Sequence, residues 1–350
     1  MKITYICFVS TFRLIFFPLS FLYYCITAIR NFLYEKGILE SKEVPVKSIV
    51  IGNLSTGGTG KSPVAIYLAH LFSRQMNTAM LSRGYGRKTK GFLEVSNDSF
   101  SVDVGDEPLM FKSVFGSDVS VFVSENRNEG IEQLMRLNPN IQLILLDDAF
   151  QHRQTKAGFQ LVLTTFNSPF YLDYMLPVGN LRESRNGARR ADAIIVTKCP
   201  ENIAEETKKS ILYSLSKYQK PILFSRIIYG EWVSFTSKIP QIKNVLLVTG
   251  IAETTDLIHY LERDFLVDHM AFPDHHEFTL GDIEKIHRKF DTFASSDKVI
   301  VTTFKDYMRL KRNVVSWGLD LVPWYFLPIS VTIENETEFI KLIQNYVGKN

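Results

Sequence analysis

A glycine-rich stretch carries residue types that bind phosphate. Residues 51–63 read IGNLSTGGTGKSP, which ends in the glycine, lysine and serine of a phosphate-binding loop. Glycines let successive backbone N–H groups turn toward a phosphate, and a following helix N-terminus strengthens that field. Lys61 would reach the β- and γ-phosphates of a nucleotide, and the hydroxyl of Ser62 would bind Mg²⁺. Because Ser55 stands where the common motif has glycine, a plain glycine turn is the alternative. The residues predicted to surround the phosphates are Ser55, Thr56, Gly57, Gly58, Thr59, Gly60, Lys61 and Ser62.

An apolar run farther along the chain ends in two acidic residues. Residues 141–148 read IQLILLDD, so Asp147 and Asp148 follow a predicted strand directly. A carboxylate at the end of a strand can approach Mg²⁺ directly or through water. The alternative is a solvated strand end. His152 follows closely, and it could orient Asp148 or only cap the loop.

Two further motifs contain candidate acid–base residues. Residues 105–108 read GDEP; acidic residues before a proline commonly start a helix, but Asp106 could also act as a general base. Residues 273–278 read PDHHEF, and no partner ligand at a standard zinc spacing accompanies them. We therefore favour His275 as a residue that assists a base or contacts an acceptor, against a solvated polar loop.

Basic residues accompany these motifs. The stretch 82–88 reads SRGYGRK and contains Arg83 and Tyr85, and LPVGNLRE ends in Arg182 and Glu183. Arginine forks fit phosphate oxygens, either on a nucleotide or on a phosphorylated acceptor. The alternative is a run of surface cations.

The elements that must position these residues alternate between strands and helices. Strands are expected at 44–51, 78–82, 119–123, 141–146, 161–165, 193–197, 221–229, 245–250, 266–272 and 298–303. Helices are expected at 63–72, 128–137, 255–263, 280–294 and 335–346, the last with Asn335 as its cap. Such alternation is typical of an α/β fold with a parallel sheet covered on both faces. A hinge is expected near residues 215–240, and a cleft between two α/β lobes would suit a two-substrate site. Three parts are predicted: an N-terminal hydrophobic, membrane-associating segment at 1–40, a P-loop kinase domain at 41–220, and a hinge with a smaller α/β lobe at 221–350.

The composition is that of a globular protein without an evident nucleic-acid partner. The chain has 350 residues, 45% of them hydrophobic, and a formal net charge of only +3. Nucleic-acid binding usually shows as a clustered basic face, which is not evident here. The three cysteines are scattered, which fits a reducing cytosol and gives neither a disulfide framework nor a metal-ligand spacing.

The N-terminal segment is unusually apolar. From Ile3 to Ile29 the only charged residue is Arg13. The uninterrupted part, Leu14–Ile29, is somewhat shorter than the roughly 20 residues of a spanning helix, and Tyr favours the membrane interface. An interfacial anchor, a single spanning helix and a buried core helix all fit this pattern, and the first two place the protein at a membrane.

In their order along the chain, these motifs resemble one family. GNLSTGGTGKSP, LSRGYGRK, VGDEP, LDDAFQHR, LPVGNLRE, VTK, FPDHHEF and VTTFKD are similar to the tetraacyldisaccharide 4'-kinases, the lipid A 4'-kinases of Gram-negative bacteria. A hydrophobic N-terminal segment also belongs to that pattern. The resemblance implies a P-loop NTPase-like domain, a second α/β lobe joined by a hinge, and an N-terminal membrane-associating helix. It also implies transfer of the γ-phosphate of ATP–Mg²⁺ to the 4'-hydroxyl of a tetraacyldisaccharide 1-phosphate, which forms lipid IVA at the cytoplasmic face of the inner membrane. It implies no nucleic acid and no protein partner.

The resemblance also implies roles for single residues. Lys61 and Ser62 would contact phosphate and metal, and Asp147 and Asp148 match metal-associated carboxylates. Asp106 matches a proposed catalytic base, and His275 matches its assisting histidine. Arg182 and Glu183 match residues near the site. Family members usually have threonine where Ser62 stands and often glycine where Ala149 stands, whereas a small hydroxyl residue at the place of Ser55 is common.

Other functions share part of this pattern. A membrane-associated partitioning or transport ATPase would need the loop, but not an acceptor-side base such as Asp106 or its partner His275. A GTPase would need an aspartate after Thr197 and Lys198, and cysteine follows instead. A non-catalytic scaffold would leave the phosphate loop and the acidic pair unexplained.

Overall fold

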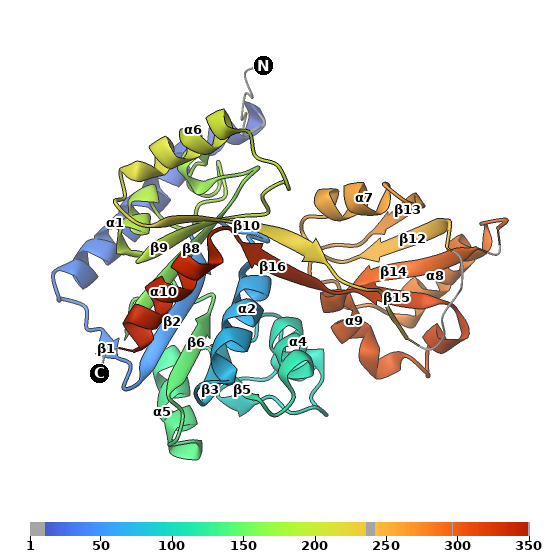
Figure 1. Cartoon of the computed structure of the whole chain (residues 1–350), viewed down its shortest axis with the longest axis horizontal. Coiled ribbons are helices and arrows are strands. Elements are labelled where there is room, and N and C mark those ends of the chain that lie inside the picture. Colours follow the sequence, from blue (N-terminus) through green and yellow to red (C-terminus); the bar gives the residue numbers. More distant parts are fainter. Residues whose placement is uncertain (1–10, 236–241, 296, 349–350) are drawn as a thin grey trace. The chain divides into compact units, whose positions relative to one another are not determined.

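Two folded units share the chain, and the chain passes between them more than once (Figure 1). The computed structural model describes residues 11–235, 242–295 and 297–348. The first unit contains the described residues up to Arg83, Ser117–Ile228 and those from Val331 onward. The second unit contains the described residues of Gly84–Gly116 and Tyr229–Ser330.

This division differs from the predicted boundary at residues 220 and 221. Residues 84–116 lie in the second unit although they interrupt the P-loop domain in sequence, and the chain from Val331 returns to the first unit. The cause is long-range packing, because helix α4 (Asp106–Phe115) packs against helix α9 (Phe304–Leu310). Local sequence patterns do not encode such a contact.

One sheet, parallel except at one edge, forms the centre of the first unit. Its strands are β2 (Lys47–Asn53), β3 (Thr78–Ser82), β5 (Val119–Val123), β6 (Leu143–Asp147), β8 (Phe159–Thr165), β9 (Ala193–Thr197), β10 (Ile222–Tyr229) and β16 (Ile329–Ile333). They lie in the order β16-β10-β9-β8-β2-β6-β3-β5, and the edge strand β16 runs antiparallel to β10. β2 pairs in parallel with β6 on one side and with β8 on the other. These central strands are buried and mostly apolar, as expected for a parallel sheet covered on both faces.

Helices cover this sheet. They are α2 (Lys61–Ser73), α5 (Arg127–Leu137), α6 (Glu205–Ser216) and α10 (Glu336–Val347). α2 and α10 lie side by side (Figure 1), and the hydroxyl of Tyr67 on α2 donates a hydrogen bond of 2.7 Å to Glu336 on α10. α10 reaches the sheet through Tyr346, whose hydroxyl accepts a bond of 3.0 Å from the amide of Ser48. The C-terminal helix thus completes the cover of the P-loop sheet.

The second unit is built on a smaller sheet with the order β11-β15-β14-β12-β13. Its strands are β11 (Val233–Ser234), β12 (Asn244–Thr249), β13 (Leu266–Ala271), β14 (Lys298–Thr303) and β15 (Trp324–Leu327), and all neighbours are parallel except β11 with β15. Its helices are α3 (Ser101–Val104), α4, α7 (Thr255–Leu261), α8 (Leu280–Asp291) and α9. Alternate strand residues face two separate cores. One contains Leu246, Val248, Ile300 and Trp324, and the other contains Val245, Leu247, Val299 and Tyr325.

Short elements complete the described chain. The strands β1 (Lys42–Glu43) and β7 (Thr155–Lys156) pair in parallel, and β4 is Leu93–Glu94. The 3-10 turns are η1 (Thr11–Phe16), η2 (Phe170–Leu172), η3 (Arg185–Arg190), η4 (Lys311–Asn313) and η5 (Leu319–Leu321).

The N-terminal helix α1 (Phe17–Glu35) lies on the surface of the first unit. Only one of its residues, Ser20, is buried, so the expectation of a buried core helix is wrong. Together with the preceding turn it is the single helix, among the described residues, that is long and apolar enough to cross a membrane. Residues 1–10, which include the start of the apolar segment, lie outside the described part of the chain.

Most expected elements are present with ends shifted by a few residues, and the α/β fold class is confirmed. Asn335 does precede α10, but its side chain makes no capping hydrogen bond. Its φ of +56° is the reason, because an N-cap residue normally has an extended backbone that turns its side chain toward the first helical N–H groups.

Candidate active site

The glycine-rich loop joins β2 to α2. Gly57 and Gly60 have φ values of +97° and +82°, which only glycine adopts at low cost. Gly60 lies directly before the first turn of α2, so the N–H groups of that turn face the loop. The hydroxyl of Thr197, at the end of β9, donates a bond of 2.8 Å to the carbonyl of Thr59 and holds the loop from the neighbouring side. The loop therefore has the geometry of an anion site at a helix N-terminus.

Ser55 is not a strained substitute for glycine. It forms an antiparallel bridge with Leu181, and the amide of Thr56 donates a bond of 2.7 Å to the carbonyl of Asn180. Ser55 is not among the described non-glycine residues with positive φ. Its extended backbone pairs with the LPVGNLRE segment, and the entrance of the loop needs no glycine there.

Lys61, Asp148 and Arg182 meet at the C-terminal ends of the central strands. The Lys61 amino group lies 3.6 Å from Oδ1 of Asp148. Arg182 binds the same carboxylate through Nη2, at 2.9 Å, and Nη1, at 3.2 Å. Burial alone would raise the pKa of Asp148, but Lys61 and then Arg182 hold this pKa well below its usual value. Asp148 has a φ of +46°, which is uncommon outside glycine and is typical of backbone held in place at functional sites.

Asn53 connects these charged groups to the loop, a role that no sequence motif indicates. Its Oδ1 accepts hydrogen bonds from Lys61, at 3.5 Å, and from Arg182, and its Nδ2 donates a bond of 2.8 Å to the hydroxyl of Thr59. Asn53 is fully buried. Its position as the last residue of a buried strand is the only signal that could have found it.

Asp147 and Glu183 are buried behind this cluster. Asp147 accepts a bond of 3.4 Å from the hydroxyl of Ser82. Glu183 pairs with Arg190 at 2.9 Å and accepts a bond of 2.9 Å from Gln151. Gln151 also donates a bond of 2.7 Å to the backbone carbonyl of Asn53, so Glu183 supports the cluster through Gln151.

His152 lies in a positively charged part of the first unit. Burial lowers the pKa of this imidazole to about 4, and Arg127 and Arg83 add to the effect. A neutral ring is therefore expected at physiological pH. The described structure contains no hydrogen bond from this ring to Asp148, so the expected orienting role has no support.

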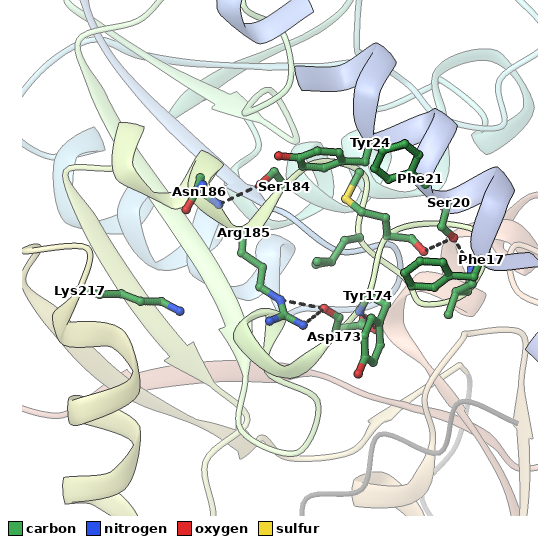
Figure 2. A pocket seen from close by; sticks show the side chains of 13 residues that line it. Phe17, Ser20, Phe21, Tyr24, Asp173, Tyr174, Ser184, Arg185, Asn186 and Lys217 are labelled. Atoms are coloured by element: carbon green, nitrogen blue, oxygen red, sulfur yellow. Dashed lines mark hydrogen bonds between the residues drawn. The ribbon is translucent and has the colours of Figure 1, made fainter. Parts of the chain in front are cut away.

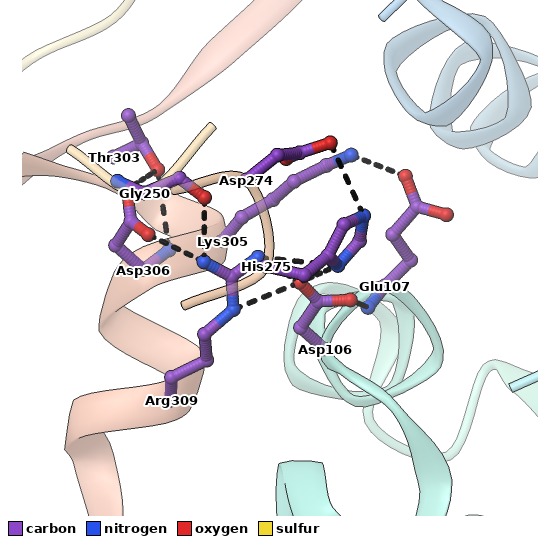
Figure 3. A network of polar contacts seen from close by, with 9 residues as sticks. All are labelled: Asp106, Glu107, Gly250, Asp274, His275, Thr303, Lys305, Asp306 and Arg309. Carbon is purple, nitrogen blue, oxygen red and sulfur yellow. Dashed lines mark hydrogen bonds and ion pairs between the residues drawn. The ribbon is translucent and has the colours of Figure 1, made fainter. Parts of the chain in front are cut away.

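In the second unit, Asp106 and His275 lie in direct contact (Figure 3). Nδ1 of His275 is 3.1 Å from Oδ2 of Asp106, and Oδ1 of Asp106 accepts a bond of 2.8 Å from the amide of Glu107. Asp106 begins α4, so it starts a helix and lies in a polar cluster at the same time. Tyr85, which is largely exposed, lies beside the His275 ring at 5.0 Å between centroids. His275 has a φ of +57°, a second uncommon backbone at a candidate site residue.

The charges around this pair shift both pKa values. Burial alone would raise the pKa of Asp106, but the hydrogen bond with His275 and the cations Arg309 and Lys305 hold this pKa well below its usual value. The same hydrogen bond raises the pKa of His275 above its ordinary value. The pair thus favours an ionised carboxylate beside an imidazole that binds a proton tightly.

Helix α9 supplies a buried arginine to the pair that sequence reasoning missed. Arg309 donates to Oδ2 of Asp106 through Nε, at 3.0 Å, and through Nη2. Lys305 pairs with Glu107 on the same side. The VTTFKD motif ends at Asp306, three residues before Arg309.

A cavity of about 230 Å³ opens beside Asp106 and His275 within the second unit. Its walls include aromatic and cationic side chains, namely Tyr85, Lys88, Phe100, Arg312 and Trp317. The guanidinium group of Arg312 lies 4.4 Å from the centroid of the Phe100 ring. Aromatic faces with cations beside an acid–base pair suit a polar ring that carries negative charge.

A second groove lies along α1 in the first unit (Figure 2). It has a volume of about 350 Å³, and its lining includes Phe17, Phe21, Tyr24, Arg185 and Lys217. The lining is mostly apolar, with cations at its edge. Such a surface resembles the interfacial zone of membrane-associated proteins.

The oxygen donors near the loop match what Mg²⁺ requires when a nucleotide is bound. Within the described ranges, no group of three or more His, Cys, Asp or Glu side chains could hold a metal by itself. Mg²⁺ is usually bound by one or two carboxylates together with phosphate oxygens and water. Ser62 at the start of α2 and Asp147 and Asp148 at the end of β6 provide such oxygens.

The chain is similar to known proteins over nearly its whole length. A model of the tetraacyldisaccharide-1-P 4'-kinase family matches residues 12–348. A tetraacyldisaccharide 4'-kinase of Flavobacterium johnsoniae is 42% identical over 345 residues, which are 97% of this chain and 98% of that protein. One of Bacteroides thetaiotaomicron is 39% identical over 355 residues, which cover 95% of this chain and 93% of that protein. The crystal structure of LpxK from Aquifex aeolicus in complex with ATP has a TM-score of 0.73 and 28% identity, and it covers 96% of this chain and 99% of that chain.

Proposed function

This chain belongs to the tetraacyldisaccharide-1-P 4'-kinase family, and we propose that it transfers the γ-phosphate of ATP to the 4'-hydroxyl of a tetraacyldisaccharide 1-phosphate. The product would be lipid IVA. The observation that carries the proposal is the presence of two chemistries on one chain. A phosphate loop with Lys61 and Arg182 serves a nucleotide, and the contact of Asp106 with His275 serves a hydroxyl acceptor. An ATPase that only switches conformation needs the first and has no use for the second.

On the donor side, the loop amides and Lys61 would surround the β- and γ-phosphates of ATP. Phosphoryl transfer depends mainly on positioning and on neutralising charge at the phosphate oxygens. Lys61 and Arg182 both contact Asp148, so this carboxylate would hold the two cations near the loop until phosphate oxygens attract them. Asn53 would fix the loop through Thr59 while it accepts from the same cations.

A magnesium ion bound with the nucleotide would supply neutralisation of the charge that develops on the phosphate oxygens. Ser62, Asp147 and Asp148 are the residues we propose to hold it, directly or through water. Arg182 occupies both oxygens of Asp148 in the described structure, so this carboxylate would contribute after that contact changes or through a water molecule.

On the acceptor side, Asp106 and His275 would act as one base. A carboxylate with a lowered pKa is a weak base by itself. His275 binds a proton more tightly than usual, so the 3.1 Å contact lets the pair accept the proton of the 4'-hydroxyl together. As the oxygen attacks the γ-phosphorus atom, the bond to ADP breaks and the hydroxyl proton passes to this pair. The cavity beside it would hold the sugar ring, with Tyr85 and Arg312 among its walls.

The donor groups lie in the first unit and the acceptor groups in the second. Transfer therefore requires a reacting complex in which both groups reach one γ-phosphate. Exclusion of water from that complex would limit the competing hydrolysis of ATP.

We also propose that α1 lies on the cytoplasmic face of the inner membrane. Ser20 and Tyr23 donate hydrogen bonds to the carbonyls of Met175 and Arg182, and Asn31 donates one to Glu183. These contacts extend over roughly 16 Å of helix at about 1.5 Å per residue. A helix bound along that length to the first unit is better placed to lie in the interface than to cross a bilayer. Its exposed apolar side chains would meet the acyl chains of the membrane that holds the acceptor.

The test is transfer of label from [γ-³²P]ATP to the disaccharide 1-phosphate lipid in detergent micelles. We expect label in the lipid with the wild-type protein, and a loss of at least about 10²-fold with Asp106→Asn at nearly unchanged ATP affinity. Asp98→Asn, which changes an exposed acid of the same unit, is the matched control. Release of phosphate from ATP without labelled lipid would instead support the ATPase alternative.

A further inference from the structure

Arg309 is anchored on one side by groups of its own unit (Figure 3). Its Nη1 donates a bond of 2.7 Å to Oδ1 of Asp306 and one of 2.9 Å to the carbonyl of Gly250. Asp306 is fully buried and is itself fixed, because its Oδ2 accepts bonds from the hydroxyl of Thr303, at 2.7 Å, and from the amide of Gly250, at 3.1 Å. The space is tight, since a Cβ atom at Gly250 would lie 3.0 Å from Oδ1 of Asp306.

The opposite edge of the guanidinium group faces the acid–base pair. Nε and Nη2 both donate to Oδ2 of Asp106, the same oxygen that contacts His275. Nη2 also lies 3.4 Å from Nδ1 of His275. A planar guanidinium group with one edge fixed can present its other edge in only one direction.

We propose that Arg309 is a positioning residue for the reaction, which holds the ionised carboxylate of Asp106 in the orientation that faces His275. The inference rests on the proposed function, because it assumes that Asp106 and His275 serve as the base. Arg309 contacts neither the nucleotide nor the acceptor in this scheme. It acts through Asp106, and Asp306 with Gly250 keeps it in place.

The charge of Arg309 has a consequence besides its geometry. This cation lowers the pKa of Asp106, and it also opposes protonation of His275. Without it, both groups would bind protons more tightly, and the pair would become available as a base only at higher pH. The charged groups that face the pair are Arg309 and Lys305 from α9, Asp274 beside His275, and Asp306 behind Arg309.

The experiment compares pH profiles of lipid phosphorylation for the wild type, Arg309→Met and Arg309→Lys. We expect Arg309→Met to lower kcat by about 10²-fold, as a displaced catalytic group does. The acidic limb in the pH profile of kcat/KM should shift to higher pH for Arg309→Met. Arg309→Lys keeps the charge and loses the fork, so its rate should fall while its acidic limb stays near the wild-type position.

A matched control lies two residues away. Lys311 is exposed, and Lys311→Met removes a cation from the same region without touching Asp106. ATP affinity should be unchanged in every variant, because the phosphate loop lies in the other unit. A loss of rate in Arg309→Met with an unshifted pH profile would overturn the proposal and leave a merely structural role. If Arg309→Met does not fold, the rate of Arg309→Lys tests the positioning role. A wild-type rate for Arg309→Lys would then overturn the proposal.

Failure of the proposed function would look different. A wild-type protein that transfers no phosphate to lipid would refute the kinase proposal before any variant is compared. A wild-type kinase whose Arg309 variants keep both rate and pH profile would refute only the role of Arg309.

Discussion

Arg182 holds the carboxylate of Asp148 with both terminal nitrogens of its guanidinium group, at 2.9 Å and 3.2 Å. Lys61 approaches the same carboxylate to 3.6 Å, so two cations share one anion beside the phosphate loop. A bidentate contact of this kind fixes the angle of the carboxylate as well as its distance. The position of Lys61 therefore depends on Arg182 through Asp148.

Arg182→Lys should lower kcat by about tenfold to a hundredfold, because an ammonium group cannot reproduce the fork and Lys61 would then pair more closely with Asp148. Rates of lipid phosphorylation at saturating ATP check this. Arg189→Lys is the control, since Arg189 is exposed in the same stretch of chain. A wild-type rate for Arg182→Lys would show that the bidentate contact is dispensable.

Asn53→Ala should weaken ATP binding. The substitution removes the acceptor for Lys61 and Arg182 and leaves the hydroxyl of Thr59 without its buried partner. A buried polar group that loses its partner costs about 1–3 kcal/mol, which corresponds to roughly a tenfold to hundredfold change in Kd. Titration of a fluorescent ATP analogue measures it. Gln151→Ala should have a smaller effect, because the Gln151 amide bonds to Glu183 and to the backbone carbonyl of Asn53, and the Asn53 side chain keeps its partners. Equal ATP affinity in wild type and Asn53→Ala would contradict the role.

The sequence predicted those parts of the site that follow from local patterns. Asp148 lies directly after β6, and Lys61 begins the helix that follows the loop after β2. The C-terminal ends of these parallel strands meet at one edge of the sheet, so the two positions come together there. Asp106 and His275 were singled out by motif, but their 3.1 Å contact depends on the chain folding residues 84–116 onto the second unit. No local hydrophobic pattern or helix-capping residue predicts that residues 84–116 belong to the second unit.

The residues that the sequence did not reveal are of a different kind. Arg309 occupies a short helix in which an arginine ordinarily reads as a solvated cation, yet its side chain is only 7% exposed. Its burial is set by Asp106, 203 positions away in the chain. From the sequence, Asn53 likewise resembles an ordinary strand end or turn residue. Its role follows only from the structure, in which Lys61 and Arg182 donate to its side chain. Supporting residues of a site are recognised by what surrounds them, and that information is in the fold.

The pH dependence of kcat/KM should show an acidic limb governed by the Asp106–His275 pair. Contact with Asp106 raises the pKa of His275 above its ordinary value near 6.5, so the pair loses its ability to accept a proton as the pH falls through that raised value. Initial rates between pH 5.5 and 9, at about half-unit intervals, measure the limb.

In His275→Gln the limb should move to much lower pH, because only the carboxylate of Asp106 then titrates, and the rate should fall by about 10²-fold. His259→Gln, in α7 of the same unit, is the control. An identical limb in wild type and His275→Gln would exclude His275 from the titrating pair.

Membrane binding should depend on the exposed face of α1. Phe21 and Ile26 are 62% and 57% exposed, so a charge at either position disturbs little packing within the first unit. Full burial of one such side chain contributes about 1.5–3 kcal/mol, and the double variant Phe21→Asp with Ile26→Asp should therefore lower partitioning into vesicles by at least about tenfold. Sedimentation with vesicles that contain anionic lipid measures the bound fraction, and Tyr213→Asp on α6 is the matched control, since Tyr213 is 83% exposed.

Phosphorylation of the lipid substrate in detergent micelles should stay within about threefold of the wild-type rate, because the hydrogen bonds of Ser20, Tyr23 and Asn31 to the first unit are unchanged. A double variant that remains on vesicles under high salt would contradict an interfacial helix and favour one that crosses the bilayer.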